Sequence, residues 1–403
     1  MGRLRRRLVV LLAFFVVAAP VASAATPAPS TALQRQLSKA LRVPHVSPAR
    51  SAAIAVDLAT GSVLYTQNGS RPLEPASNEK LPVTLAALTT LGPAYRYETD
   101  VLGEGTQEGT LWQGAIVLKG GGDPTLSSAD LRSLALQVRA AGVRRIAGPV
   151  VGDASWYDSR RTVAGWKPGF YINESPPLSA LVVDRDRGNA PNPALAAATL
   201  FRVALRRAGV AVTGAPRVGV ANEYAVSLAS VESAPLASIL RFMDHESDNF
   251  TAEMVLKELG ASQGGQGTSA AGAAVVMHEL ADAGVPLAGV RIVDGSGLSV
   301  LDRLTANALT SLLRAAWLDP DVRPVLRAAL PVAGVNGTLE DRMRRGPAHG
   351  TVLAKTGTTS EASALSGFVR DRYAFAVLQN GHPVSYWWAR VAQDRFAQVL
   401  AAQ

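Results

Sequence analysis

Residues 74–91 read EPASNEKLPVTLAALTTL and contain a Ser-x-x-Lys motif, Ser77 to Lys80. Leucines recur at helical spacing after a proline-containing loop, which predicts a helix over residues 77–91. Ser77 then lies at the positive end of the helix dipole, which favours a developing alkoxide. Lys80 shares its helix face, and a dry setting beside another cation would lower the pKa of its amine enough for general-base work. The alternative interpretation is a helix N-cap serine followed by a surface lysine.

Lysine is scarce in this chain, which has 34 Arg and only six Lys, at positions 39, 80, 119, 167, 257 and 355. Arginine cannot release its proton in a protein, whereas lysine can when its surroundings lower its pKa. A lysine that remains is therefore a candidate for a position where arginine would fail. Two of the six, Lys80 and Lys355, fall in short motifs.

Ser247-Asp248-Asn249 is a second motif, in a polar break between two helical stretches within residues 235–259. Ser247 is a candidate to relay a proton to a leaving amine, and the Asn249 amide is a candidate to hold a substrate carbonyl. The alternative is a plain helix N-cap or turn, where Ser, Asp and Asn are favoured.

Lys355-Thr356-Gly357, followed by Thr358, lies on a strand predicted over residues 352–358. Lys355 and the threonine hydroxyls are candidates to bind the terminal carboxylate of a peptide, and Gly357 would let a substrate backbone approach closely. The backbone N–H groups of Ser77 and Thr358 are candidates for an oxyanion hole. Taken alone, the motif also fits an ordinary lysine near a strand end.

Taken together and in this order, the three motifs resemble the signature of penicillin-binding proteins and class A β-lactamases. The first two are 170 residues apart. That spacing resembles the low-molecular-mass class C penicillin-binding proteins, which are exported D-alanyl-D-alanine carboxypeptidases and endopeptidases. The resemblance runs from about Val56 to the C-terminus and is supported by residues 120–126, 179–181 and 294–299. The last of these segments suggests no chemical role.

The resemblance implies an α/β (α+β) fold. A penicillin-binding, serine β-lactamase-like domain with an antiparallel sheet flanked by helices would span residues 31–96 and 236–403. A mainly β domain, residues 97–235, would be inserted in it. The implied function is that of a serine D-Ala-D-Ala carboxypeptidase that acts on peptidoglycan stem peptides through an acyl-enzyme, with possible endopeptidase activity. β-Lactams would be covalent inhibitors, and no metal or cofactor would be needed. The implied site has Ser77, Lys80, Ser247, Asn249 and Lys355 as catalytic residues and Thr356, Gly357 and Thr358 as substrate-binding residues.

One departure concerns the insertion. After residues 182–185, members of the family usually carry a long further segment before the helix that begins near Pro193. Here a seven-residue bridge, residues 186–192, replaces it. We therefore expect the insertion to be smaller than is usual for the family. The aromatic residues Trp156, Tyr157 and Trp166 within it are candidates for pocket walls or for buried core.

Rival functions share these motifs. A β-lactamase typically holds a separate Glu on a loop to activate water, and no segment here resembles that loop. An esterase of the related fold usually has Tyr-x-Asn as its middle motif, against which Ser247 argues. A non-catalytic penicillin- or muropeptide-binding protein would acylate without turnover, and the rate of deacylation cannot be inferred from a sequence.

The N-terminal segment predicts export. Four arginines, an apolar run over residues 8–19 and Ala22-Ser23-Ala24 form a secretory signal peptide, residues 1–24. A membrane anchor is the alternative, although the run is shorter than the roughly 20 residues of a spanning helix. We expect an exported protein of the cell envelope, periplasmic or extracellular, without a stable membrane anchor.

Composition excludes several classes of protein. The chain of 403 residues is 48% hydrophobic and 18% charged, which is typical of a globular protein. Its charge of +8 falls to +4 without the four arginines of the signal peptide, since 36 basic then face 32 acidic residues, and this gives no case for nucleic-acid binding. Without cysteine there is no disulfide and no thiol nucleophile. The five histidines lack metal-binding spacing, and no Gly-x-Ser-x-Gly elbow is present.

Overall fold

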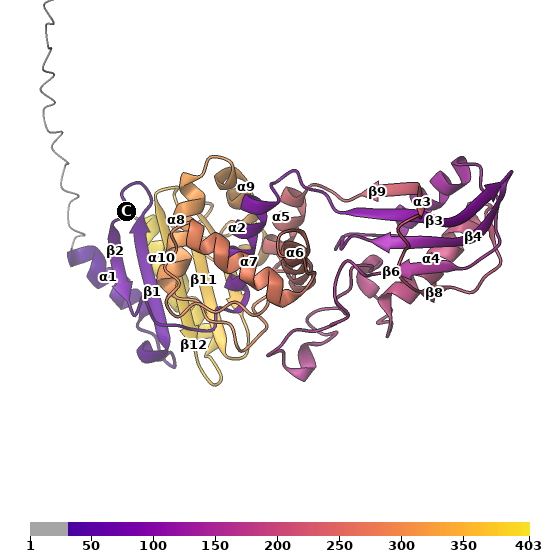
Figure 1. Ribbon diagram of the computed structural model, residues 1–403. Helices are drawn as coiled ribbons and strands as arrows, with labels where there is room; N and C mark the ends of the chain where they lie inside the picture. Colours follow the sequence, from indigo (N-terminus) through magenta and orange to yellow (C-terminus); the bar gives the residue numbers. More distant parts are fainter. Residues whose placement is uncertain (1–30) are drawn as a thin grey trace, which may run out of the picture.

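The computed structural model describes residues 31–403 as two bodies, each built on its own β-sheet (Figure 1). The predicted signal peptide, residues 1–24, lies outside the described residues. Within residues 31–403, every helix is too short or too polar to cross a bilayer. The larger body at the left of Figure 1 combines the two ends of the described chain, and the smaller one at the right holds the middle.

The larger body is built on a five-stranded antiparallel sheet in the order β10-β11-β12-β1-β2. Its members are β1 (Ser51–Asp57), β2 (Val63–Gln67), β10 (Val352–Thr358), β11 (Ala362–Val369) and β12 (Tyr373–Asn380). The pairing of β1 with β12 brings the N-terminal hairpin beside the C-terminal strands. β10 lies at the edge of the sheet. Its first half pairs outward with residues 331–333, through a bridge between Leu353 and Val332, whereas within residues 31–403 its second half has no strand on that side.

Helices cover both faces of this sheet because successive side chains of a strand point to opposite sides. Ala53 and Ala55 face a core with α1 (Thr31–Leu41) and α10 (Tyr386–Ala401). Ile54 and Val56 face a larger core formed with the remaining helices. These are α2 (Lys80–Thr90), α5 (Leu236–Glu246), α6 (Asn249–Ser262), α7 (Ser269–Asp282), α8 (Ala306–Leu318) and α9 (Val322–Ala329).

The smaller body is a mixed sheet covered by two helices. Its strands are β3 (Glu98–Glu108), β4 (Leu111–Gly120), β5 (Arg145–Ile146), β6 (Val150–Asp153), β7 (Ala211–Val212), β8 (Arg217–Val218) and β9 (Val226–Glu232). The long β3–β4 hairpin is antiparallel, whereas β5 and β6 pair with β4 in parallel. The helices α3 (Ser128–Ala140) and α4 (Pro193–Arg207) bury their apolar sides in a separate core against this sheet.

The junction between the two bodies centres on α6. The carboxylate of Glu258 accepts hydrogen bonds from Trp156 Nε1 and from Tyr157 Oη, both at 2.9 Å. The next residue, the buried Lys257, forms an ion pair with Asp158. Trp156 and Tyr157, which the sequence left as pocket wall or core, therefore fasten the middle segment to α6.

The fold class predicted from the sequence is confirmed, including the antiparallel sheet with helices on both faces. Several element predictions agree to within a few residues, and the strand over residues 352–358 agrees at both ends. Residues 181–183, whose apolar sequence is typical of a strand, instead form an irregular buried segment. The helices α3, α7 and α9 were not predicted.

Candidate active site

The turn that carries Ser77 is a short 3-10 helix, Ala76–Glu79, which leads directly into α2. The sequence predicted one continuous helix here, and the tighter turn at its start is the difference. Ala76 has a positive φ of 46°, a left-handed conformation that is unusual for a residue with a Cβ. Lys80, the first residue of α2, is fully buried, and its Nζ lies 3.0 Å from Ser77 Oγ.

Three acceptors surround the amine of Lys80. Besides Ser77 Oγ, its Nζ contacts Asn249 Oδ1 and the Ser296 carbonyl oxygen, both at 2.8 Å. Burial lowers the pKa of Lys80 to about 8, against the opposing pull of Asp294 and other carboxylates. The amine is thus fixed in position and titrates close to physiological pH, which suits a general base.

The second motif lies where α5 ends and α6 begins. Ser247 takes a left-handed conformation, φ 59° and ψ 38°, that stops α5. Asp248 then caps α6 by accepting the N–H of Thr251 at 2.7 Å. This sharp change of direction brings Ser247 Oγ within 2.8 Å of Lys355 Nζ, while Asn249 reaches Lys80. Strain in a non-glycine residue is commonly found at functional sites.

The third motif lies on β10, the edge strand. Lys355 is buried, and burial followed by the positive charge of Lys80 lowers its pKa to about 7. Asn78 Nδ2 donates to the Lys355 carbonyl at 3.0 Å and ties the serine turn to the strand. A Cβ on Gly357 would lie 2.8 Å from Pro75 O and 3.0 Å from Ser77 N, so only glycine allows this approach without displacement.

The backbone of β10 presents alternate N–H groups to its open side. Thr359 N donates to Ala362 within the hairpin, whereas Ala354 N donates outward to Pro331. Because donors alternate along an antiparallel strand, the N–H of Thr358 faces outward as well. The Thr358 side chain is exposed, whereas Thr356 is buried and its Oγ1 is 2.8 Å from Thr338 Oγ1. The open edge can therefore receive an extended peptide beside Ser77.

Comparison with known families decides between the groups that share these motifs. The profile of the D-Ala-D-Ala carboxypeptidase 3 (S13) family matches residues 33–191 and 189–403. The chain belongs to this family. The prediction of a penicillin-binding family of carboxypeptidases and that of a serine-type D-Ala-D-Ala carboxypeptidase are thereby confirmed.

Individual S13 relatives agree with this assignment. The D-alanyl-D-alanine carboxypeptidase of Actinomadura sp. (strain R39) is 33% identical, over 91% of this chain and 84% of its own length. Carboxypeptidase DacB of Mycolicibacterium smegmatis is 33% identical, over 85% and 78%. The crystal structure of penicillin binding protein 4 (dacB) from Haemophilus influenzae superposes with a TM-score of 0.81 at 22% identity, covering 91% of this chain and 98% of the other, which shows the same fold.

A buried loop behind the S13 motifs, residues 294–299, is part of the site that sequence reasoning could not interpret. Its Ser296 carbonyl accepts from Lys80, and a Cβ on Gly297 would lie 1.9 Å from Ala76 O. The carboxylate of Asp294 folds the loop by accepting the N–H groups of Gly297 and Ser299 at 2.7 and 2.8 Å. The loop therefore packs against the turn that carries Ser77 and accepts a hydrogen bond from Lys80.

Glu253 is a further residue that was missed. From α6 its Oε1 accepts the N–H groups of Gly295 and Ser296 at 3.1 and 2.8 Å and so holds the loop in place. Burial, followed by the charge of Asp294, raises the pKa of Glu253 to about 8. Glu253 follows Asn249 by four residues and so shares its helix face, which is a signal that could have identified it.

A methyl group at Gly297 tests whether this loop positions the nucleophile. Gly297 has a φ of +81°, and a Cβ there would overlap Ala76 O. We expect Gly297→Ala to shift the turn by a fraction of an ångström and to lower the rate of acylation by penicillin at least about 100-fold. The measurement is stopped-flow acylation, with Gly284→Ala as control, since that glycine also has a positive φ but open space around it. Equal rates in the two variants would show that the loop is passive.

An irregular connection of the middle segment, residues 163–175, contacts the site and contains a short 3-10 helix, Pro168–Phe170. Trp166 Nε1 donates to Asp294 Oδ2 at 2.8 Å, and Lys167 forms a 2.8 Å ion pair with Glu361 in the β10–β11 turn. Further along, the Glu174 carbonyl accepts from Asn249 Nδ2 at 3.1 Å. This connection is therefore attached to both walls of the site, and Trp166 helps to hold it there.

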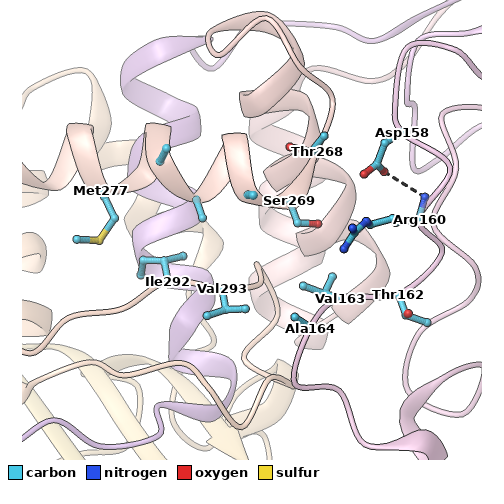
Figure 2. Close-up of a pocket in the computed structure, with 13 residues that line it drawn as sticks. Asp158, Arg160, Thr162, Val163, Ala164, Thr268, Ser269, Met277, Ile292 and Val293 are labelled. Atoms are coloured by element: carbon cyan, nitrogen blue, oxygen red, sulfur yellow. Dashed lines mark hydrogen bonds between the residues drawn. The ribbon is translucent and has the colours of Figure 1, made fainter.

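The cavity in Figure 2 is separate from this constellation. It has a volume of about 600 Å³ and lies between the loop of residues 158–164, the start of α7 and residues 292–293. Asp158 and Arg160 reach toward it from the loop, and Thr268 and Ser269 from the helix start. Within the described chain, the residues that line it include none of the predicted site residues.

Proposed function

We propose that Ser77 is the nucleophile with which this S13 carboxypeptidase releases the terminal D-alanine of peptidoglycan stem peptides. The observation that supports this assignment is the convergence of the three motifs. Lys80 Nζ lies 3.0 Å from Ser77 Oγ and 2.8 Å from Asn249 Oδ1, while Lys355 Nζ lies 2.8 Å from Ser247 Oγ.

In the first step, neutral Lys80 accepts the proton of Ser77 as Oγ attacks the carbonyl carbon between the two D-alanines. The N–H groups of Ser77 and Thr358 stabilise the oxyanion that forms. Collapse of the tetrahedral intermediate breaks the C–N bond. The leaving D-alanine amine takes a proton delivered through Ser247, which Lys355 contacts, and Ser77 is left as an ester.

Binding of the substrate uses the remaining residues of the motifs. Lys355 and the hydroxyls of Thr356 and Thr358 receive the terminal carboxylate, and the Asn249 amide orients the preceding carbonyl. Gly357 lets the peptide lie along the edge of β10. A β-lactam presents a carboxylate and a strained amide in the same relation and forms a long-lived ester with Ser77.

In the second step, water attacks the ester carbonyl and gives up a proton to Lys80. Lys80 passes a proton to Ser77 Oγ as the ester C–O bond breaks, which restores the free serine. When the amine that leaves belongs to a neighbouring stem peptide instead of free D-alanine, the same sequence of steps is endopeptidase cleavage. A cross-linked muropeptide assayed beside the linear peptide separates the two reactions.

Several further points belong to this proposal. Peptidoglycan lies outside the cytoplasmic membrane, so we place the enzyme in the cell envelope, periplasmic or extracellular, exported by residues 1–24. We also assign residues 97–235 to an inserted domain, shorter than is usual for the family, between the catalytic segments 31–96 and 236–403.

The test combines two substrates over a range of pH. We expect covalent labelling by a fluorescent penicillin and release of D-alanine from a D-Ala-D-Ala peptide. Because burial lowers the pKa of Lys80 to about 8, the acylation rate should rise from pH 6 to pH 9 with an apparent midpoint near 8, as the amine loses its proton. The two lysines interact, so the midpoint belongs to the pair.

Each outcome of this experiment is informative. Label without release of D-alanine from either substrate would support a penicillin-binding protein that does not turn over. Rapid loss of label with release of hydrolysed penicillin would indicate a β-lactamase. A rate that does not vary from pH 6 to pH 9 would contradict the role of Lys80, and absence of label would contradict the whole site.

A further inference from the structure

The solvent-facing side of α4 is apolar, which is unusual for a surface helix. Leu195, Leu200 and Val203 expose 38%, 43% and 41% of their surfaces, while Phe201 and Leu205 on the opposite side are buried in the core. A helix at a protein surface normally directs polar residues to solvent. Here three large aliphatic side chains occupy that side, and we call them the α4 face.

The surroundings of the α4 face are basic. Residues 187–222 contain five arginines and no Asp, Glu or Lys. The arginines are Arg187, Arg202, Arg206, Arg207 and Arg217. The strand β8 contacts α4, and Val218 in this strand and Val220 just after it are exposed by 44% and 69%. In Figure 1, α4 and β8 lie beside each other in the smaller body. On α4 itself, exposed arginines, Arg206 and Arg207, follow the exposed aliphatic side chains, so cations and apolar groups lie on one helix.

A short bridge, residues 186–192, leads into α4. The alignment with the Actinomadura relative spans 452 positions, more than the 403 residues of this chain, so the relative has residues without a counterpart here. The two parts of the S13 match meet at residues 189–191, within the bridge of residues 186–192. A groove of about 780 Å³ lies between the bridge and α4, lined by residues 183–200.

We propose that the α4 face docks on an anionic membrane surface. Aliphatic side chains that enter the headgroup region, combined with arginines that pair with anionic lipids, are the two contributions that hold an amphipathic helix at a bilayer. A purely anionic polymer would account for the arginines and leave the exposed leucines unexplained. Interfacial docking needs no spanning helix, in agreement with the absence of one within residues 31–403. The inference is independent of the proposed catalytic roles.

The experiment is co-sedimentation with vesicles. Vesicles of 30% phosphatidylglycerol in phosphatidylcholine are compared with phosphatidylcholine alone, for wild-type full-length protein and variants with the same N-terminus. We expect binding to the anionic vesicles only. Leu200→Glu/Val203→Glu should weaken it at least about tenfold, since two charges replace the inserted groups. Arg207→Gln/Arg217→Gln should weaken it roughly fivefold per arginine.

The matched control is Leu318→Glu/Val63→Glu, which also introduces two charges, at side chains of the larger body that are 56% and 47% exposed. It should bind like the wild type, and D-alanine release in every variant reports an intact fold. Unchanged binding by Leu200→Glu/Val203→Glu would overturn the proposal. Failure of the wild-type protein to co-sediment with anionic vesicles would also overturn it. The wild type could instead form a dimer in solution that Leu200→Glu/Val203→Glu dissociates, without binding vesicles. That result would identify the α4 face as an interface between copies of the chain and would also overturn the proposal.

Discussion

We expect replacement of Ser77 by Ala to abolish labelling by fluorescent penicillin and to lower D-alanine release by at least about 10⁴-fold, the order of loss seen when a nucleophile is removed. The physical reason is that within the described site the attacking oxygen has no substitute close to Lys80. Ser247 Oγ is held by Lys355, and Asn249 offers an amide. The measurement is labelling on a gel together with D-alanine release at a fixed enzyme concentration.

A matched change distinguishes chemistry from folding. Ser62→Ala alters a serine in the β1–β2 turn and should leave both activities unchanged. Because Ser77 is half-buried, its truncation should move the thermal unfolding midpoint by only a few degrees. D-alanine release that persists in a folded Ser77→Ala protein refutes the assignment of the nucleophile.

Lys80→Arg is expected to cause the second largest loss, about 10³-fold in the rate of acylation, although the positive charge is retained. Arginine stays protonated at any pH the protein survives, so it cannot accept the proton of Ser77. Its planar head is also too large for a fully buried position that is fitted to three acceptors around one nitrogen. Stopped-flow acylation at pH 9, where the wild-type amine is mostly neutral, shows the largest contrast.

Lys39→Arg on α1 is the control for this pair, since Lys39 is exposed and distant from the site in sequence and fold. It should acylate at the wild-type rate. If Lys80→Arg acylates within tenfold of the wild type, a proton acceptor other than Lys80 operates. In that case the pH profile should have its midpoint near 7, where burial places the pKa of Lys355.

The three motifs could be found in the sequence because each is a short run of adjacent side chains with unusual chemistry. The loop of residues 294–299 was visible as a segment but had no assignable role, since it acts through the Ser296 carbonyl and the small size of Gly297. Every residue has a carbonyl, and only tertiary packing determines which one meets a buried amine. Arg185 was missed as a site residue for the same reason, because its ion pair with Asp248 joins segments 63 residues apart.

The missed helix α3 has a different cause. Ser127 and Asp130 form a capping box at its start, a signature that is legible in the sequence. The frequent glycines and turn residues around it favoured a β interpretation of the part of the middle segment before α4. By contrast, the left-handed conformations of Ala76 and Ser247 leave no trace in the sequence, since neither residue type prefers them.

The attachment of the middle segment to α6 bears on which parts of such a chain can be lost over evolution. The helix that begins with Asn249 also carries Lys257 and Glu258, and these anchor Asp158, Trp156 and Tyr157. Deletions that removed those anchors would loosen α6, the helix that begins with Asn249. The bridge begins at residue 186, directly after Arg185, whose guanidinium still holds the first turn of α6. The seven-residue bridge thus leaves the ion pair between Arg185 and Asp248, at the start of α6, in place.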